Sequence, residues 1–219
     1  MATWMVHLKI AENIFWFLKE KTQLYDNFFI GSIAPDCGKP TRNPLVFNPP
    51  KQITHFTPTG EKSQCDYFTF AEHYIKNENN NYKKSFYLGY FSHLVGDVLW
   101  SEKIVFSIKN RFNIKSFDDS KLLKKIKDDW FALDFLLAKN ESYGFNVLKN
   151  VSEVEFENIY FNFYSDHILL QLKNIVKYYE NITINNNKEY KYLNKIQLDE
   201  FIIESSNIII DLIRDILKI

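Results

Sequence analysis

The sequence predicts an all-α fold, a bundle of several helices in a single domain. Apolar residues recur at helical spacing in long stretches, whereas the alternation typical of strands is nearly absent. The most apolar stretch, residues 85–106, follows a polar segment and predicts one long buried helix at the centre. A chain of 219 residues is long enough to bury a sizeable core.

The composition limits the class of protein. The formal net charge is zero, which argues against capture of a nucleic-acid backbone as the main activity. The two cysteines, Cys37 and Cys65, form no CxxC motif, so a structural zinc ribbon is not indicated. No apolar run reaches the roughly 20 residues that cross a bilayer, and residues 1–21 lack the features of a signal peptide. We therefore expect a cytoplasmic protein.

The first helix is predicted over residues 4–19, because the apolar residues there fall on one broad face. His7 belongs to that face and is expected to point inward. The apolar segment 28–35 ends at Pro35, and a proline disfavours helical conformation in the residue before it. We expect Asp36 on a tight loop there, either as an ordinary turn residue or as a carboxylate directed into the interior.

Residues 39–62 are predicted to be irregular, since they hold every proline of the chain except Pro35. Long loops in compact domains are usually functional or disordered. His55 lies here between a β-branched and an aromatic residue, which favours an anchored imidazole. Residues 65–75 are predicted to form an amphipathic helix, with His73 at the surface.

The predicted central helix carries two polar side chains, His93 and Asp97, which stand four residues apart and share one helical face. Burying them is costly unless both are satisfied, either by each other as a structural pair or by one metal ion. Gly89 and Gly96 lie close to that face, and glycine costs about 1 kcal/mol relative to alanine inside a helix. Their presence favours close approach of another backbone or of an ion.

Helices are also predicted in the second half of the chain. Residues 121–138 show helical periodicity, and Asp129 and Asp134 flank aromatic residues there, so one of these carboxylates is expected to face inward. Residues 151–179 are predicted as one helix or two. Residues 197–219 are predicted as a closing amphipathic helix, with a dimer contact or a membrane surface as alternatives to packing on the domain.

Five polar residues are expected in buried surroundings: His7, Asp36, His55, His93 and Asp97. Imidazoles and carboxylates in this mixture suit Zn²⁺ and related ions. Two ions bridged by Asp97 would use all five ligands, and two metals about 3.5–4 Å apart can deprotonate a water and hold a phosphoryl oxygen. His73 and His167 are not expected to take part, since His167 and the adjacent Asp166 point in different directions on a helix.

Four short motifs, taken in order, resemble the bacterial zinc-dependent phospholipase C family. They are TW-x-x-H at residues 3–7, GSIAPD at 31–36, THF at 54–56 and HLVGD at 93–97. That family shares its all-helical fold with zinc-dependent single-strand-specific nucleases. The resemblance covers about the first 140 residues, so residues 1–140 are expected to hold the metal site and residues 141–219 to complete the bundle.

The resemblance implies roles for the five residues. Asp36, His55, His93 and Asp97 would bind one metal ion. His7 and Asp97 would bind a second ion, with Asp97 as the bridge. Asp36 would also be a candidate general base for the attacking water. The metals would lie in a cleft of the helical bundle.

The chain also departs from the family pattern. The secreted enzymes bind metal through a free N-terminal tryptophan, whereas Trp4 here follows three other residues. The histidine expected ten residues after His93 is Lys103, and the later His–Glu pair is missing from the sequence. Glu102, Asp129 and Asp134 are candidate replacements. We therefore expect one or two ions, zinc or another divalent metal, rather than three.

The expected function is that of a metal-dependent hydrolase that cleaves a phosphodiester, as phospholipase C does. The expected partner is a phosphodiester substrate, with phospholipid as one candidate, and no stable nucleic-acid partner. The alternatives are a nuclease of the same fold and a metal-binding interaction module without catalysis. A phosphohydrolase built on an adjacent His-Asp pair is disfavoured, because the chain holds only Asp166-His167, in the reverse order.

Overall fold

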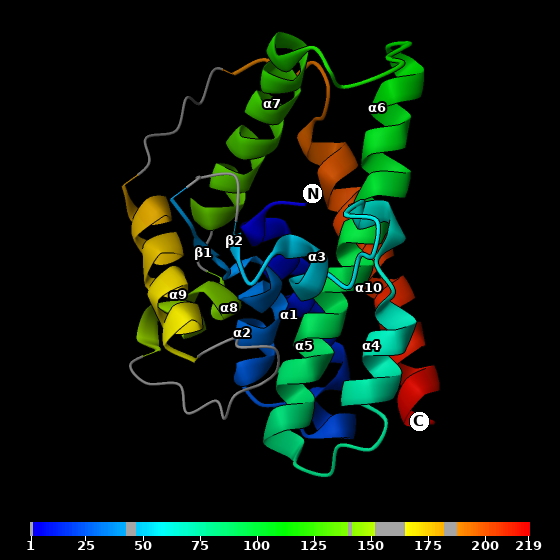
Figure 1. Ribbon diagram of the computed structural model, residues 1–219, viewed down its shortest axis with the longest axis vertical. Coiled ribbons are helices and arrows are strands. Elements are labelled where there is room, and N and C mark those ends of the chain that lie inside the picture. The colour runs from blue at the N-terminus through cyan, green and yellow to red at the C-terminus, as the bar shows by residue number, and fades with distance from the viewer. Residues whose placement is uncertain (1, 43–46, 140–141, 152–164, 182–187) are drawn as a thin grey trace.

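The computed structural model describes residues 2–42, 47–139, 142–151, 165–181 and 188–219, and there the fold is the expected all-α bundle (Figure 1). The elements of the first part of the chain are α1 (Trp4–Thr22), α2 (Asn27–Ile33), the 3-10 turn η1 (Ala34–Asp36), β1 (Lys39–Pro40), β2 (Phe47–Asn48), α3 (Lys51–Thr54), the 3-10 turn η2 (Lys62–Gln64) and α4 (Tyr67–Tyr74). The remaining elements are α5 (Asn81–Leu99), the π-helical segment η3 (Trp100–Val105), α6 (Phe106–Arg111), α7 (Ser120–Lys139), α8 (Tyr143–Asn150), α9 (Ser165–Glu180) and α10 (Lys195–Leu217).

Polar side chains fix where several helices begin. The Asn80 side chain accepts hydrogen bonds from the backbone N–H groups of Tyr82 and Lys83 at the start of α5. Asn194 and Gln197 form a reciprocal capping box at the start of α10. Such caps satisfy N–H groups that have no partner within their own helix, so these boundaries follow from the local sequence.

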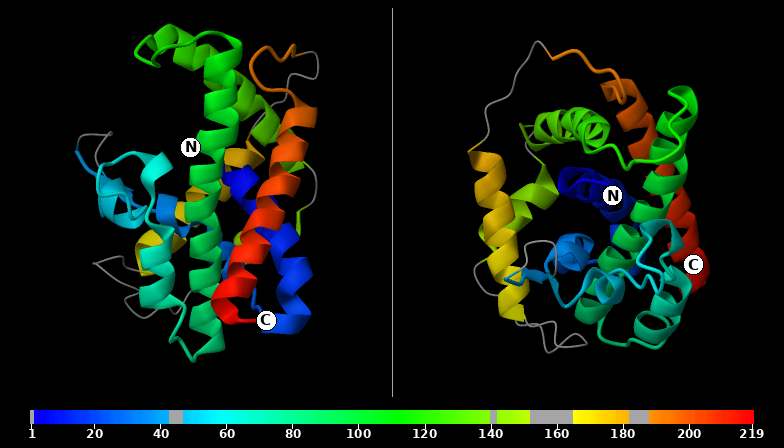
Figure 2. Two further views of the ribbon diagram at one scale, coloured as in Figure 1. Left: turned by 90° about the vertical axis from the view of Figure 1, so that its right-hand side faces the viewer. Right: turned by 45° about the horizontal axis from the view of Figure 1, so that its top comes forward.

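The long central helix is confirmed and extends beyond residues 85–106 at both ends. α5, η3 and α6 follow one another as a single rod from Asn81 to Arg111 (Figure 2). The difference from the prediction is the π-helical segment η3. Ser101, the second residue of this segment, donates from its hydroxyl to the Asp97 carbonyl at 2.9 Å. A hydroxyl bonded to the carbonyl four residues earlier competes with the backbone ladder and often bends a helix.

α2 crosses α5 at very close range, and two glycines permit it. A Cβ on Gly89 would lie 1.9 Å from the Phe28 carbonyl oxygen, and one on Gly31 would lie 2.0 Å from that of Phe86. The expected approach of another backbone at Gly89 is therefore found. α2 was not expected as a helix, because its seven residues are too few to show clear periodicity.

The region 39–62, expected to be irregular, contains β1, β2 and α3 among its described residues. β1 and β2 pair antiparallel, with Lys39 opposite Asn48 and Pro40 opposite Phe47. α3 follows, and His55 is the residue that ends it. The imidazole is thus fixed by a short helix and fully buried rather than carried on a free loop.

The later helices close the bundle around α1 and α5. The predicted helices 121–138 and 197–219 correspond to α7 and α10, and α10 packs along α1 and α5 (Figure 2). Of the predicted segment 151–179, residues 152–164 lie outside the described residues, and α9 covers the rest. One buried core cluster contains residues from Ala2 to Ile213. Within the described residues, no helix has the length and apolar character needed to span a membrane.

Candidate metal centre

The fold brings the five predicted residues together from four segments. His7 comes from α1, Asp36 from η1 and His55 from the end of α3, while His93 and Asp97 come from α5. Each side chain belongs to a residue that is at most 6% exposed. Their burial side by side follows from the close crossing of α2 and α5, because η1 continues directly from α2.

Asp97 lies at the centre of the group. Its Oδ1 atom is 3.5 Å from His7 Nε2. Its Oδ2 atom is 3.7 Å from the Nε2 atom of His55 and 3.7 Å from that of His93. One carboxylate therefore faces three imidazoles with two different oxygens. The backbone N–H of Ala2 donates to Oδ1 at 3.1 Å.

Asp36 occupies the other side of the group. Its Oδ1 atom lies 3.3 Å from His55 Nε2 and 3.6 Å from the half-buried Lys51 Nζ, while Trp4 Nε1 donates to Oδ2 at 3.1 Å. The donor atoms form two groups, each with its atoms within 4.8 Å of one another: His7, His93 and Asp97; and Asp36, His55 and His93.

Neighbouring groups orient the imidazole rings. His93 Nδ1 lies 2.8 Å from the Ser32 carbonyl oxygen, which only accepts, so Nδ1 carries the proton and the Nε2 lone pair faces Asp97. His55 Nδ1 lies 3.0 Å from the Thr54 hydroxyl. Contacts of this kind fix the tautomer of metal-binding histidines. Gly96 leaves room for the His7 ring, because a Cβ there would lie 3.3 Å from His7 Nδ1.

The electrostatics keep at least one imidazole neutral. Burial lowers the pKa of His93 well below its usual value, and the nearby His7 lowers it further. The two rings stack with centroids 3.7 Å apart and planes 9° apart, so protonating both would place two positive charges in contact. Neutral imidazole is the form that binds metal ions.

The unsatisfied nitrogen atoms fit a cation. Among the described residues, neither ring nitrogen of His7 nor Nε2 of His93 has a hydrogen-bond partner. Buried polar atoms without a partner are costly, and a metal ion would satisfy His93 Nε2 and the unprotonated nitrogen of His7. Histidine nitrogen and carboxylate oxygen atoms are common zinc ligands. The residues present therefore fit zinc.

The three further candidates lie elsewhere. Glu102 is exposed on η3. Asp129 accepts from the backbone N–H groups of Lys191 and Tyr192. Asp134 accepts from the Thr3 hydroxyl, the Met5 N–H at 3.1 Å and the Tyr179 hydroxyl. Both aspartates are thus buried with donors from the chain itself, and neither belongs to the two donor groups.

The surface position expected for His73 is found, since it is exposed on α4. His167, on α9, lies outside both donor groups. Sequence reasoning missed two contacts of Asp36, the Trp4 indole and the Lys51 ammonium. Trp4 stands in the TW-x-x-H motif, but nothing in that motif indicates that its side chain reaches Asp36.

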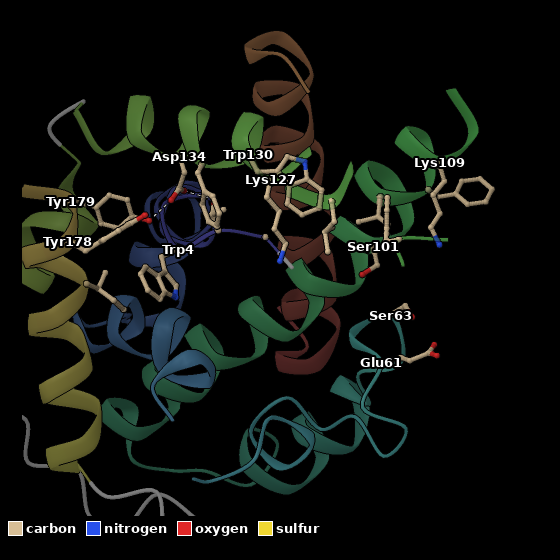
Figure 3. A pocket seen from close by; sticks show the side chains of 18 of the residues that line it. Trp4, Glu61, Ser63, Ser101, Lys109, Lys127, Trp130, Asp134, Tyr178 and Tyr179 are labelled. Carbon is tan, nitrogen blue, oxygen red and sulfur yellow. Dashed lines mark hydrogen bonds between the residues drawn. The ribbon is translucent and has the colours of Figure 1, made fainter. Parts of the chain in front are cut away.

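A pocket of about 1060 Å³ lies beside the centre. Its lining is mostly apolar and comes mainly from the N-terminal segment, η3 and the helices α6, α7 and α9, with Glu61, Ser63 and Phe117 in addition. Figure 3 shows Trp4, Asp134 and Tyr179 at one end of the pocket and Lys109 at the other. Because Ala2 donates to Asp97 and Trp4 donates to Asp36, the same N-terminal segment borders both the pocket and the centre.

A family model described as zinc dependent phospholipase C matches residues 6–213. No curated protein and no solved structure matches the chain. The match includes all five residues of the centre and extends well past the first 140 residues, through α7, α8, α9 and most of α10.

Proposed function

The chain belongs to the zinc-dependent phospholipase C family, and we propose that it is a hydrolase that cleaves a phosphodiester. The observation that carries this proposal is the Asp97 carboxylate, which lies within 3.7 Å of three buried imidazole nitrogens. Family membership supports a zinc-dependent hydrolase, and the donor groups support a metal centre. The phosphodiester bond as the target is the finer part of the proposal.

One or two zinc ions would be held by the two donor groups. His7, His93 and Asp97 would hold one ion, and Asp36 with His55 and His93 or Asp97 would hold the other. When bound, zinc supplies Lewis acidity toward a phosphoryl oxygen and lowers the pKa of a water toward about 7.

Residues of the chain would supply the general base and the positive charge near the substrate. Asp36 is the proposed general base, since its carboxylate lies beside His55 and accepts from Trp4 at Oδ2. The Lys51 ammonium lies 3.6 Å from the same carboxylate and is 36% exposed, so it places a positive charge where an anionic substrate would arrive. Burial of all five ligands limits the access of bulk water to the centre.

The pocket supports a substrate with a large apolar part. Phe106 and Phe131 line it and are 61% and 43% exposed, which means that it is open to solvent. Lys109 and Lys127 add positive charge to the lining, and Glu61 adds negative charge. Ligand pockets are typically apolar with a few polar groups that orient the ligand. A phospholipid fits this lining better than a single-stranded nucleic acid, which needs a continuous basic groove with stacking rings.

The test begins with zinc content, measured by elemental analysis on protein purified without chelator or affinity metal. The zinc-loaded chain is then assayed on a phosphatidylcholine dispersion, a chromogenic phosphodiester and single-stranded DNA. We expect one or two ions per chain and phosphodiester cleavage, highest on the lipid. Preferential cleavage of DNA would support the nuclease instead. Bound zinc without any turnover would support the interaction module.

A substitution tests whether the activity depends on this centre. His93→Ala removes a ligand shared by both donor groups, so zinc and turnover are expected to disappear together. The matched controls are His73→Ala and His167→Ala, at histidines outside both groups, which should keep both properties. Retention of zinc and turnover in the His93 variant would mean that the centre lies elsewhere.

We also propose that the chain is one domain, with residues 1–140 carrying the centre and residues 141–219 completing the bundle. The core cluster that contains residues from Ala2 to Ile213 supports one domain. The cytoplasmic location expected from the sequence stays a prediction.

A further inference from the structure

Trp4 stands between the candidate centre and the pocket. Its indole Nε1 donates to Asp36 Oδ2 at 3.1 Å, and the residue also lines the pocket. Figure 3 shows the Trp4 ring at the end of the pocket that Tyr178 and Tyr179 also form. One side chain therefore contacts both a proposed metal ligand and the proposed binding site for the substrate.

The two oxygens of Asp36 face different partners. Oδ2 accepts from the indole, while Oδ1 lies 3.3 Å from His55 Nε2 within one of the donor groups. A carboxylate can rotate about its last torsion angle, which has broad minima. A bond that holds one oxygen fixes the direction of the other, and such outer contacts tune the affinity of metal sites.

Trp4 is itself held firmly. Its ring makes edge contacts with Tyr178 and Tyr179, at centroid distances of 6.1 and 6.3 Å. Its chain neighbours are fixed as well, because the Thr3 hydroxyl and the Met5 N–H both donate to Asp134. The indole is therefore positioned by α7 and α9 as well as by its own helix.

We propose that Trp4 is a positioning and specificity residue: its indole N–H fixes the Asp36 carboxylate toward the metal centre, while its ring forms the pocket wall that contacts the apolar part of the substrate. This inference rests on the proposed function and adds that one residue serves both sites. Its two roles use different parts of the side chain, the N–H group and the ring face, so substitutions can separate them.

The test compares Trp4→Phe, which keeps an aromatic wall and removes the N–H donor, with Trp4→Ala, which removes both. For Trp4→Phe we expect zinc to bind about 10–100 times more weakly, as is typical for lost outer contacts. At saturating zinc, kcat should fall and KM for phosphatidylcholine should stay close to that of the unaltered chain. Trp4→Ala should raise KM in addition. The matched control is Trp16→Phe, a 55% exposed tryptophan on the same helix, which should change none of these values.

A double-mutant cycle shows whether Trp4 acts through Asp36. If it does, zinc affinity in Trp4→Phe/Asp36→Ala should equal that in Asp36→Ala alone, because the indole has lost its acceptor. Co²⁺ substitution adds a spectroscopic check, since Trp4→Phe should alter the visible spectrum of the bound ion and Trp16→Phe should not. Circular dichroism and thermal melting identify any variant that has merely unfolded.

Several results would overturn the inference. They are unchanged zinc affinity in a folded Trp4→Phe variant, additive losses in the cycle, and a KM that rises equally in both Trp4 variants. If the unaltered chain binds zinc but cleaves no phosphodiester, the proposed function fails while the cycle on zinc affinity still decides the role of the N–H. A chain that binds no zinc overturns both.

Discussion

Two buried carboxylates, Asp134 and Asp97, lie near the start of α1 and differ in the kind of partner that surrounds them. Asp134 accepts hydrogen bonds from Thr3, Met5 and Tyr179, all of them donors. Asp97 faces three histidine Nε2 atoms at 3.5–3.7 Å, beyond normal hydrogen-bond length. One of these atoms, His93 Nε2, bears a lone pair and no proton, because the proton is on Nδ1 of the same ring. The contrast separates a carboxylate that joins α1, α7 and α9 through hydrogen bonds from one that we propose binds a cation.

The largest expected effect is on the structural side of this comparison. Asp134→Ala leaves the Thr3, Met5 and Tyr179 donors without their acceptor and opens a cavity between α1, α7 and α9. We expect a loss of about 3–5 kcal/mol in the free energy of unfolding, as for other broken buried polar clusters. Urea denaturation of the zinc-free chain measures it. A loss below about 1 kcal/mol would remove the distinction between Asp134 and Asp97.

The next effect concerns the centre. If the imidazole and carboxylate donors are arranged for zinc, binding should stabilise the folded chain by about 4 kcal/mol when free zinc is 1,000 times its Kd. Thermal melting with and without a chelator measures this shift. The His93→Ala variant serves as the control and should melt at the same temperature in both conditions. An unaltered chain that is insensitive to chelation would contradict the assignment of the centre.

A pH dependence sharpens the comparison further. Burial raises the pKa of Asp134 from 3.8 to about 6, although its hydrogen bonds act in the other direction. The folded chain therefore binds this proton more tightly than the unfolded chain. The resulting stability is complete below about pH 4 and is lost as the pH rises through about 6, by up to about 3 kcal/mol.

The control for this pH dependence is Asp134→Asn, which has no proton to lose. The difference in unfolding free energy between the zinc-free chain and this variant should change between pH 4 and pH 7 in the direction given above. Parallel profiles for the two proteins would show that Asp134 titrates normally in the folded state.

The smallest expected effect is at Asp97 in the zinc-free chain. In Asp97→Asn an oxygen remains to accept from the Ala2 N–H, and the new amide donates toward a histidine Nε2 atom. We expect the free energy of unfolding to change by less than about 1 kcal/mol, while zinc binding is lost. Chemical denaturation and zinc titration on the same preparation test both statements. A large destabilisation would mean that Asp97 is mainly structural.

Much of the fold could be predicted because its signals are local. The periodicity of residues 4–19, 121–138 and 197–219 depends on neighbours within a few turns, and each corresponds to an observed helix. α2 escaped this reasoning because it is short. The π-helical segment could not be predicted, because a single widened turn does not visibly change the apolar periodicity of residues 85–106.

The candidate centre was predictable in part. The spacing of His93 and Asp97 indicated a shared face, and the local sequence around His7, Asp36 and His55 indicated buried surroundings for those three residues. The partners of these residues were not predictable, since Trp4 meets Asp36 and Thr3 meets Asp134 only through the tertiary fold. For the same reason the sequence offered Asp134 as a substitute ligand, whereas it binds donors on α1 and α9.

The π-helical segment Trp100–Val105 determines how α6 is rotated about the common helix axis relative to α5. Each residue of an α-helix turns the chain by about 100°, so one residue more or less rotates the downstream part by that amount. The upstream part presents His93 and Asp97 to the centre, and the downstream part presents Phe106 and Lys109 to the pocket. A deletion of one residue in this segment would turn α6 by about a quarter of a revolution about the helix axis. The distance between the pocket and the centre would then change little, but the pocket residues of α6 would no longer face the same side as His93 and Asp97.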